Sequence, residues 1–187
     1  MNRKTALPQN GTIRFPFNER KALSASTYLL SLCNGRMPYM RLIKLLYFAD
    51  RASLQEFGRP ITGDRYVAMK LGPVLSTVYD RIRGGEWGGL IRKSGYDLEL
   101  IGKEFIDPLS DAEIEILDEV SKTFRTFDHW QLSDLSHVLP EWNDVPKNGT
   151  ISIETILRAL RKKNPEICEV REEANEESFF EEVFSDS

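Results

Sequence analysis

The chain has few of the residues that build covalent or metal-bound frameworks. Its 187 residues include two cysteines, Cys33 and Cys168, and two histidines, His129 and His137. Two cysteines are too few for a disulfide framework, and in a reducing compartment we expect two free thiols. No CxxC or HxxxH spacing occurs, so we expect no metal site.

Long apolar runs and nucleotide-binding loops are also missing. No apolar stretch approaches the roughly 18 residues that span a bilayer, and the N-terminus lacks a signal-peptide core. Neither GxxxxGK[ST] nor GxGxxG occurs, and the glycines around Trp87 match neither pattern. We therefore expect a cytoplasmic protein with no membrane partner and no cofactor.

Residues suited to catalysis are scarce. Ser133, Asp134 and His137 are the one trio that resembles hydrolase parts, but no GxSxG nucleophile elbow is present. Asp50 and Asp64 are better interpreted as acceptors for backbone N–H groups or partners of nearby arginines than as paired acids. The sequence predicts no catalytic residue and a protein that is not an enzyme.

Charge is unevenly distributed along the chain. Residues 1–103 carry 17 Lys and Arg against 8 Asp and Glu, whereas residues 169–187 carry 1 against 8. This asymmetry suits a basic surface for nucleic acid or an acidic partner, an acidic tail that shields that surface, or solvated faces of different sign. Composition leaves these three interpretations open.

What is present is a mainly helical pattern. Apolar spacing and capping residues predict about six helices, and Ser110 with Glu113 and Asp128 with Gln131 are candidate capping boxes. The predicted helices cover about residues 18–34, 38–57, a segment opened by Pro73, and three segments after residue 110. Alternation over 65–71 predicts a strand, and residues 90–93 and 96–101 predict a β-hairpin. The expected fold is mainly α (α+β) with a small antiparallel sheet.

The domain organisation predicted is one domain with two ends of different character. Residues 1–17 are expected to form a flexible arm, residues 18–166 the domain, and residues 167–187 an acidic tail. The tail also contains Phe179, Phe180, Val183 and Phe184. It could fold as a short helix into a partner's groove, pack on its own domain's basic face, or hang free.

Several linked segments follow one another in order: LIKLLYFAD (42–50), GRPITGD (58–64), YVAMK (66–70), GPV (72–74) and VYD (78–80). Together they resemble the Panacea domain family, the SocA-like antitoxins of bacterial and phage toxin–antitoxin pairs. A later helix that ends in PEW (140–142) is also similar, and the resemblance covers about residues 17–160.

The resemblance implies an antitoxin that neutralises a cognate protein toxin by direct contact. It also implies, as a variant, an adaptor that delivers the toxin to an ATP-dependent protease. It implies no catalytic residue and a chiefly helical fold. We expect the partner-binding surface to include Arg41, Lys44, Tyr66, Lys70 and Trp87, with Phe180 and Phe184 as a second anchor.

A helix followed by a hairpin with Arg92 and Lys93 also suits a winged-helix transcriptional regulator that binds DNA. Against this alternative, the best recognition-helix candidate, residues 42–49, is apolar, and the second half of the chain is acidic. Nucleic acid is therefore the less favoured partner.

Overall fold

The computed structural model describes residues 12–104 and 108–184, which form eight helices and six strands. The α+β class is confirmed, but α6 and α8 are helices beyond the six predicted. The elements in chain order are α1 (Glu19–Ser31), β1 (Arg36–Pro38), α2 (Tyr39–Phe57), β2 (Tyr66–Met69), β3 (Gly72–Leu75), α3 (Ser76–Gly84), β4 (Ile91–Ser94), β5 (Asp97–Leu100), α4 (Asp111–Thr123), α5 (His129–His137), α6 (Pro140–Asn143), β6 (Thr150–Ile151), α7 (Ile153–Ala159) and α8 (Asn164–Phe184).

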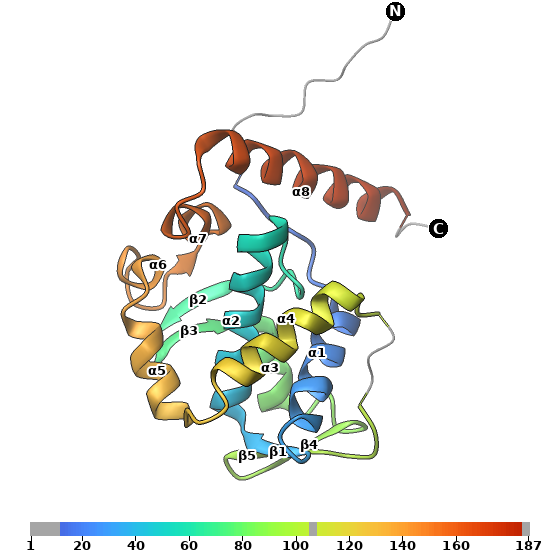
Figure 1. Ribbon diagram of the computed structural model, residues 1–187. Coiled ribbons are helices and arrows are strands. Elements are labelled where there is room, and N and C mark those ends of the chain that lie inside the picture. Colours follow the sequence, from blue (N-terminus) through green and yellow to red (C-terminus); the bar gives the residue numbers. More distant parts are fainter. Residues whose placement is uncertain (1–11, 105–107, 185–187) are drawn as a thin grey trace, which may run out of the picture.

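Helix α2 is the centre of the molecule. Its residues 42–50 are all buried, as expected of a helix that is apolar nearly all round. It contacts α1, α4, α5, α7 and β3, and it runs through the middle of Figure 1. The helix ends where the sequence predicts, at Gly58, whose φ of 73° is a conformation that suits glycine.

The fold contains two three-stranded antiparallel sheets, one at the end where α2 begins and one beside α2 (Figure 1). One has the order β1-β5-β4 and contains the predicted hairpin, in which Ser94 pairs with Asp97. The other has the order β3-β2-β6. The short strands β1 and β6 were not predicted, because three and two residues carry too little alternation to be recognised.

The prediction that Pro73 begins a helix is wrong. Pro73 lies in β3 opposite Ala68, and α3 begins three residues later at Ser76. The backbone N–H and C=O of Ala68 bond instead to Gly149 and Asn148 on its other side. Ala68 and Pro73 are therefore a non-hydrogen-bonded pair, so the missing N–H of proline costs this ladder nothing.

Local capping signals predicted the helix starts well. Both capping boxes are present, with Ser110 and Glu113 at the start of α4 and Asp128 and Gln131 at the start of α5. Asn18 caps α1 by accepting the backbone N–H of Lys21. No described helix is both long and apolar enough to cross a membrane.

The two ends of the described chain lie together. Residues 1–11 of the predicted arm are outside the described residues, but Ile13 and Phe15 are buried, and the Ile13 N–H donates to Glu154. The predicted boundary between residues 166 and 167 falls inside the continuous helix α8. In Figure 1, α8 crosses one end of the molecule, where the N-terminal segment also runs.

Candidate partner-binding surface

The carboxylate of Asp50 is the centre of a buried polar network. It accepts hydrogen bonds from the backbone N–H groups of Ile61 and Thr62, at 2.9 and 3.0 Å. The hydroxyls of Thr62 and Tyr66 also donate to it. Burial raises the pKa of Asp50 to about 6, while the hydrogen bonds from Thr62 and Tyr66 act in the opposite direction. Asp50 thus fixes the loop after α2 and the start of β2.

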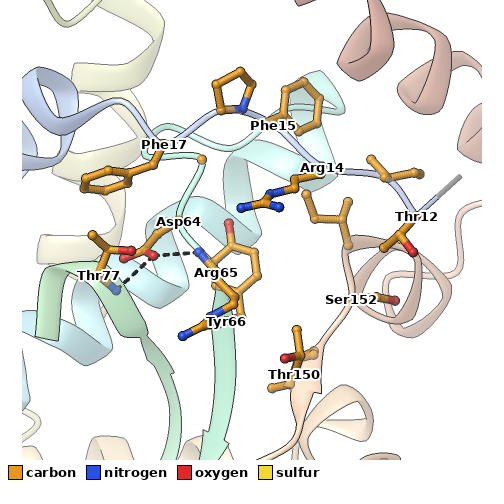
Figure 2. A pocket seen from close by; sticks show the side chains of 15 residues that line it. Thr12, Arg14, Phe15, Phe17, Asp64, Arg65, Tyr66, Thr77, Thr150 and Ser152 are labelled. Atoms are coloured by element: carbon orange, nitrogen blue, oxygen red, sulfur yellow. Dashed lines mark hydrogen bonds between the residues drawn. The ribbon is translucent and has the colours of Figure 1, made fainter. Parts of the chain in front are cut away.

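Asp64 also uses its carboxylate to accept backbone N–H groups, at the start of α3. Its side chain accepts the backbone N–H groups of Thr77 and Val78, at 3.0 and 2.9 Å, and so caps α3 from outside the helix. It also accepts the N–H of Arg65, and Figure 2 shows the bonds to Arg65 and Thr77. A negative charge at a helix N-terminus is favourable, so this carboxylate serves the fold.

Lys44 is fully buried between α2 and β3. Its Nζ donates to the carbonyl oxygen of Pro73 at 2.8 Å, and burial lowers its pKa to about 7. A Cβ at Gly72 would lie 2.5 Å from that nitrogen and 2.0 Å from the Oγ of Ser136. The glycine of the GPV segment is therefore required by the close approach of the lysine and α5.

Glu141 joins α6 to the central helix. The carboxylate is fully buried and accepts from the hydroxyl of Tyr47 at 3.0 Å and from Nε of Arg51 at 2.6 Å. Its neighbour Trp142 donates from Nε1 to the carbonyl of Met69 in β2. The PEW segment thus holds α2 and β2 in place.

A hollow of about 400 Å³ separates the N-terminal segment from the edge of β2 and β6. Figure 2 shows Phe15 and Phe17 on one side and Tyr66, Thr150 and Ser152 on the other. Asp64 is the only carboxylate among the described residues of its lining, and its oxygens are already occupied by backbone donors. The hollow therefore lacks converging acids.

An exposed tyrosine cluster lies beside the β4–β5 hairpin. Tyr96 is 80% exposed and stacks on Tyr39, whose ring is 6.4 Å away, and Tyr79 lies at the same distance on the other side. Lys93 lies over the Tyr39 ring and Arg83 over the Tyr79 ring. Burial and the two neighbouring tyrosines raise the pKa of Tyr39. Tyrosine and arginine side chains are enriched at protein interfaces.

A second exposed apolar surface lies at the end of α8. Phe179, Phe180, Val183 and Phe184 are between 48% and 68% exposed, and the rings of Phe180 and Phe184 stack at 6.2 Å. We call these four residues the α8 aromatic face. Contiguous exposed apolar side chains of this size commonly mark interaction sites.

Lys44, Asp50, Asp64 and Glu141 all lie within the range that a family model matches. A family model described as antitoxin SocA-like, Panacea domain, matches residues 42–143. The chain belongs to this family. A comparison with curated proteins and a comparison with solved structures found no match. The match lies within the domain predicted for residues 18–166, whose outer bounds remain a prediction.

Three of the residues expected on the surface of the Panacea domain are not exposed. Lys44, Tyr66 and Trp87 are 0%, 2% and 6% exposed, so their placement on an accessible surface is corrected. Lys44 and Tyr66 belong to the networks described above. Trp87 closes the glycine loop, where its Nε1 donates to Glu19 at 3.1 Å.

Arg41 and Lys70 stay nearer the surface of the domain. The guanidinium of Arg41 is half-buried and donates to the carbonyls of Phe124 and Phe127 at the end of α4, so much of its hydrogen-bonding capacity is used within the chain. Lys70 is exposed in the β2–β3 turn, beside a hollow that Trp142 lines. Phe180 and Phe184 are exposed, as a second anchor would require.

The hydrolase-like trio does not converge. Ser133 is 3% exposed, Asp134 faces solvent, and His137 stacks on Trp142 with ring centroids 4.5 Å apart. No hydrogen bond joins the three side chains within residues 12–104 and 108–184. In the same residues, no group of three His, Cys, Asp or Glu is placed to hold a metal ion.

The tyrosine cluster is the surface that sequence reasoning missed. Its members come from the start of α2, from α3 and from the turn before β5, so no spacing along the chain connects them. One feature of the sequence could have indicated this surface. Tyr96 follows Gly95 at the predicted hairpin turn, where a side chain is expected to be exposed.

Proposed function

We propose that this protein is an antitoxin that neutralises a cognate protein toxin by binding it directly, without catalysing a reaction. The observation that carries the proposal is the match of residues 42–143 to the SocA-like Panacea domain. The toxin is expected to be the product of a neighbouring reading frame.

The roles of the buried polar residues within the matched range support this proposal. Asp50, Asp64 and Glu141 accept hydrogen bonds that hold loops and helices, and Lys44 donates to a buried carbonyl. Catalytic groups need access to a substrate, whereas these side chains are at most 4% exposed. Polar side chains that are used inside the fold suit a protein that acts by binding.

The charges of the hairpin weaken the winged-helix alternative. Arg92 forms an ion pair with Glu99 at 2.7 Å, and Arg36 pairs with Asp97 at 2.7 Å and with Glu99 at 3.3 Å. Binding to DNA phosphates needs cations that are free to replace counterions. Two of the basic side chains on this sheet are neutralised within the chain.

The test is co-expression with the neighbouring protein. Growth arrest caused by that protein should be relieved by this chain, and the two purified proteins should elute together in size-exclusion chromatography. Asp50→Ala, which removes the centre of the buried network, serves as a destabilised control. Growth arrest that persists with the folded wild-type chain present would refute the antitoxin function.

The fate of the toxin separates two forms of the proposal. If the chain sequesters the toxin, the half-life of the toxin should not shorten when the chain is expressed. If the chain is an adaptor for an ATP-dependent protease, the toxin should be degraded faster with the chain than without it. A pulse-chase measurement with and without the chain distinguishes the two.

A further inference from the structure

The apolar stripe of α8 changes sides along the helix. In its first half Ile167, Val170 and Ala174 are buried against the domain. Beyond Ser178 the apolar residues are those of the α8 aromatic face. At 3.6 residues per turn they lie opposite Ser178, Glu181 and Glu182.

Contacts with the N-terminal segment show which side of the last part of α8 faces the domain. The Ser178 hydroxyl donates to the carbonyl of Arg14, and Ser178, Glu181 and Glu182 line a groove against residues 14–17. The acidic side of this last part therefore faces the domain, and the aromatic side faces away from it. An amphipathic helix that served only its own fold would have the opposite arrangement.

The first part of α8 is held firmly enough to present this face. Arg59, just after α2, forms ion pairs with Glu173 and Glu177 at 3.2 and 2.7 Å. Arg171 pairs with Glu154 of α7. The orientation of the helix is therefore set by the domain up to Ser178, and the aromatic face follows within two turns.

The charge of this part of the helix indicates which partner would fit. Residues 172–184 contain six glutamates and no lysine or arginine. Acidic side chains near a helix C-terminus interact unfavourably with the helix dipole, and α8 has no basic residue in its last turn. Docking of a second copy of α8 would bring negative charges together, whereas a cationic surface on the partner would attract the glutamates.

We infer that the α8 aromatic face, together with the exposed Glu172 and Glu176 on the same side of the helix, docks into an apolar groove rimmed by Lys and Arg on the toxin partner. This inference rests on the proposed function and adds the partner's chemistry. The aromatic face lies outside residues 42–143, so the family frame and the partner-specific contact are separate parts of the chain. Aromatic side chains in such a contact commonly carry much of the binding energy.

The experiment measures the affinity of the full-length chain for the purified neighbouring protein at two salt concentrations. Phe180→Ala/Phe184→Ala should weaken binding about tenfold or more. Trp130→Ala is the matched control, because Trp130 on α5 is 57% exposed, as is Phe180. Both variants should keep the wild-type unfolding midpoint.

The charge of the rim is tested in the same way. Glu172→Lys/Glu176→Lys, on the aromatic side of α8, should weaken binding and reduce its dependence on salt, since charge attraction is screened by ions. The control is Glu115→Lys/Glu119→Lys, which reverses two exposed charges on α4 and should leave affinity unchanged.

The outcomes separate the two proposals. Binding of Phe180→Ala/Phe184→Ala within about twofold of wild type would overturn the inference and leave the antitoxin function standing. A wild-type chain that forms a dimer lost in this variant would also overturn it, because the occupant would be a second copy. Absence of any wild-type binding would refute the proposed function, and the inference with it.

Discussion

The hydroxyl of Tyr66 donates a hydrogen bond of 2.9 Å to the carboxylate of Asp50, and this contact joins β2 to α2. The rings of Tyr66 and Tyr47 also meet edge to face at 5.7 Å. One buried acid and two tyrosines therefore connect segments that lie up to 19 positions apart. Burial and the nearby Asp50 carboxylate raise the pKa of Tyr66, which keeps its hydroxyl a donor.

Replacing Asp50 by alanine should lower the free energy of unfolding by about 3–5 kcal/mol, because it leaves two backbone N–H groups and two hydroxyls without their acceptor. Urea denaturation measures the loss. Asp134→Ala, at an exposed position of α5, should change the same quantity by no more than about 0.5 kcal/mol. Equal effects of the two substitutions would contradict this role for Asp50.

The buried lysine predicts a pH-dependent stability. Burial lowers the pKa of Lys44 from 10.5 to about 7, so between these values the unfolded chain binds a proton that the folded chain has lost. The free energy of unfolding should therefore rise with pH across this window, by an amount on the order of 4 kcal/mol. Lys44→Met should remove this rise.

Urea denaturation at several pH values from 7 to 10.5 checks the prediction. Lys70→Met is the control, because Lys70 is exposed and its replacement should leave the rise in place. A Lys44→Met variant whose stability changes with pH as the wild type does would show that Lys44 is not the group responsible.

Arg41 is expected to stabilise the fold rather than to bind a partner. Its guanidinium donates to the carbonyls that end α4, and Arg41→Ala should lower the free energy of unfolding by about 1–2 kcal/mol. Arg41→Lys should be more stable than Arg41→Ala but less stable than the wild type, because a single ammonium cannot span both carbonyls. Arg125→Ala, at a nearby exposed position, should have little effect. A loss of partner binding at unchanged stability would contradict this assignment.

Gly58 links the end of α2 to α8. Its φ is 73°, and a Cβ there would lie 2.9 Å from Cγ2 of Val170. Gly58→Ala should therefore combine about 1–2 kcal/mol of backbone strain with displacement of α8, visible as faster amide exchange in that helix. Gly85→Ala is the matched control: φ is 70° and no atom lies within 4 Å of the added carbon, so the strain occurs alone. Unchanged exchange in α8 of Gly58→Ala would refute the link.

The parts of the fold that the sequence predicted correctly are those set by neighbouring residues. The capping boxes at Ser110 and Asp128, the stop at Gly58 and the hairpin turn at Gly95 each depend on side chains within a few positions. Such signals act before any distant contact forms. Elements that depend on such signals can therefore be predicted from the sequence alone.

The misplaced residues depend on contacts from distant segments. Lys44 was predicted on the partner-binding surface, because the sequence around it could not reveal that Pro73 and α5 cover it. Pro73 resembled a helix start, because the bonds that satisfy Ala68 come from residues 148 and 149. The exposure of Phe180 and Phe184 agrees with the sequence, since an aromatic cluster in an acidic segment is visible without a partner element, and their role in binding stays a prediction.

The pairing of β2 with β6 has a consequence for synthesis on the ribosome. The backbone C=O and N–H of Ala68 form hydrogen bonds with the N–H of Asn148 at 2.7 Å and the C=O of Gly149 at 2.9 Å. These partners are synthesised some eighty residues after Ala68. A nascent chain cannot complete this sheet until most of its length has left the exit tunnel. Premature termination before residue 148 would leave an open strand edge for quality-control proteases to recognise.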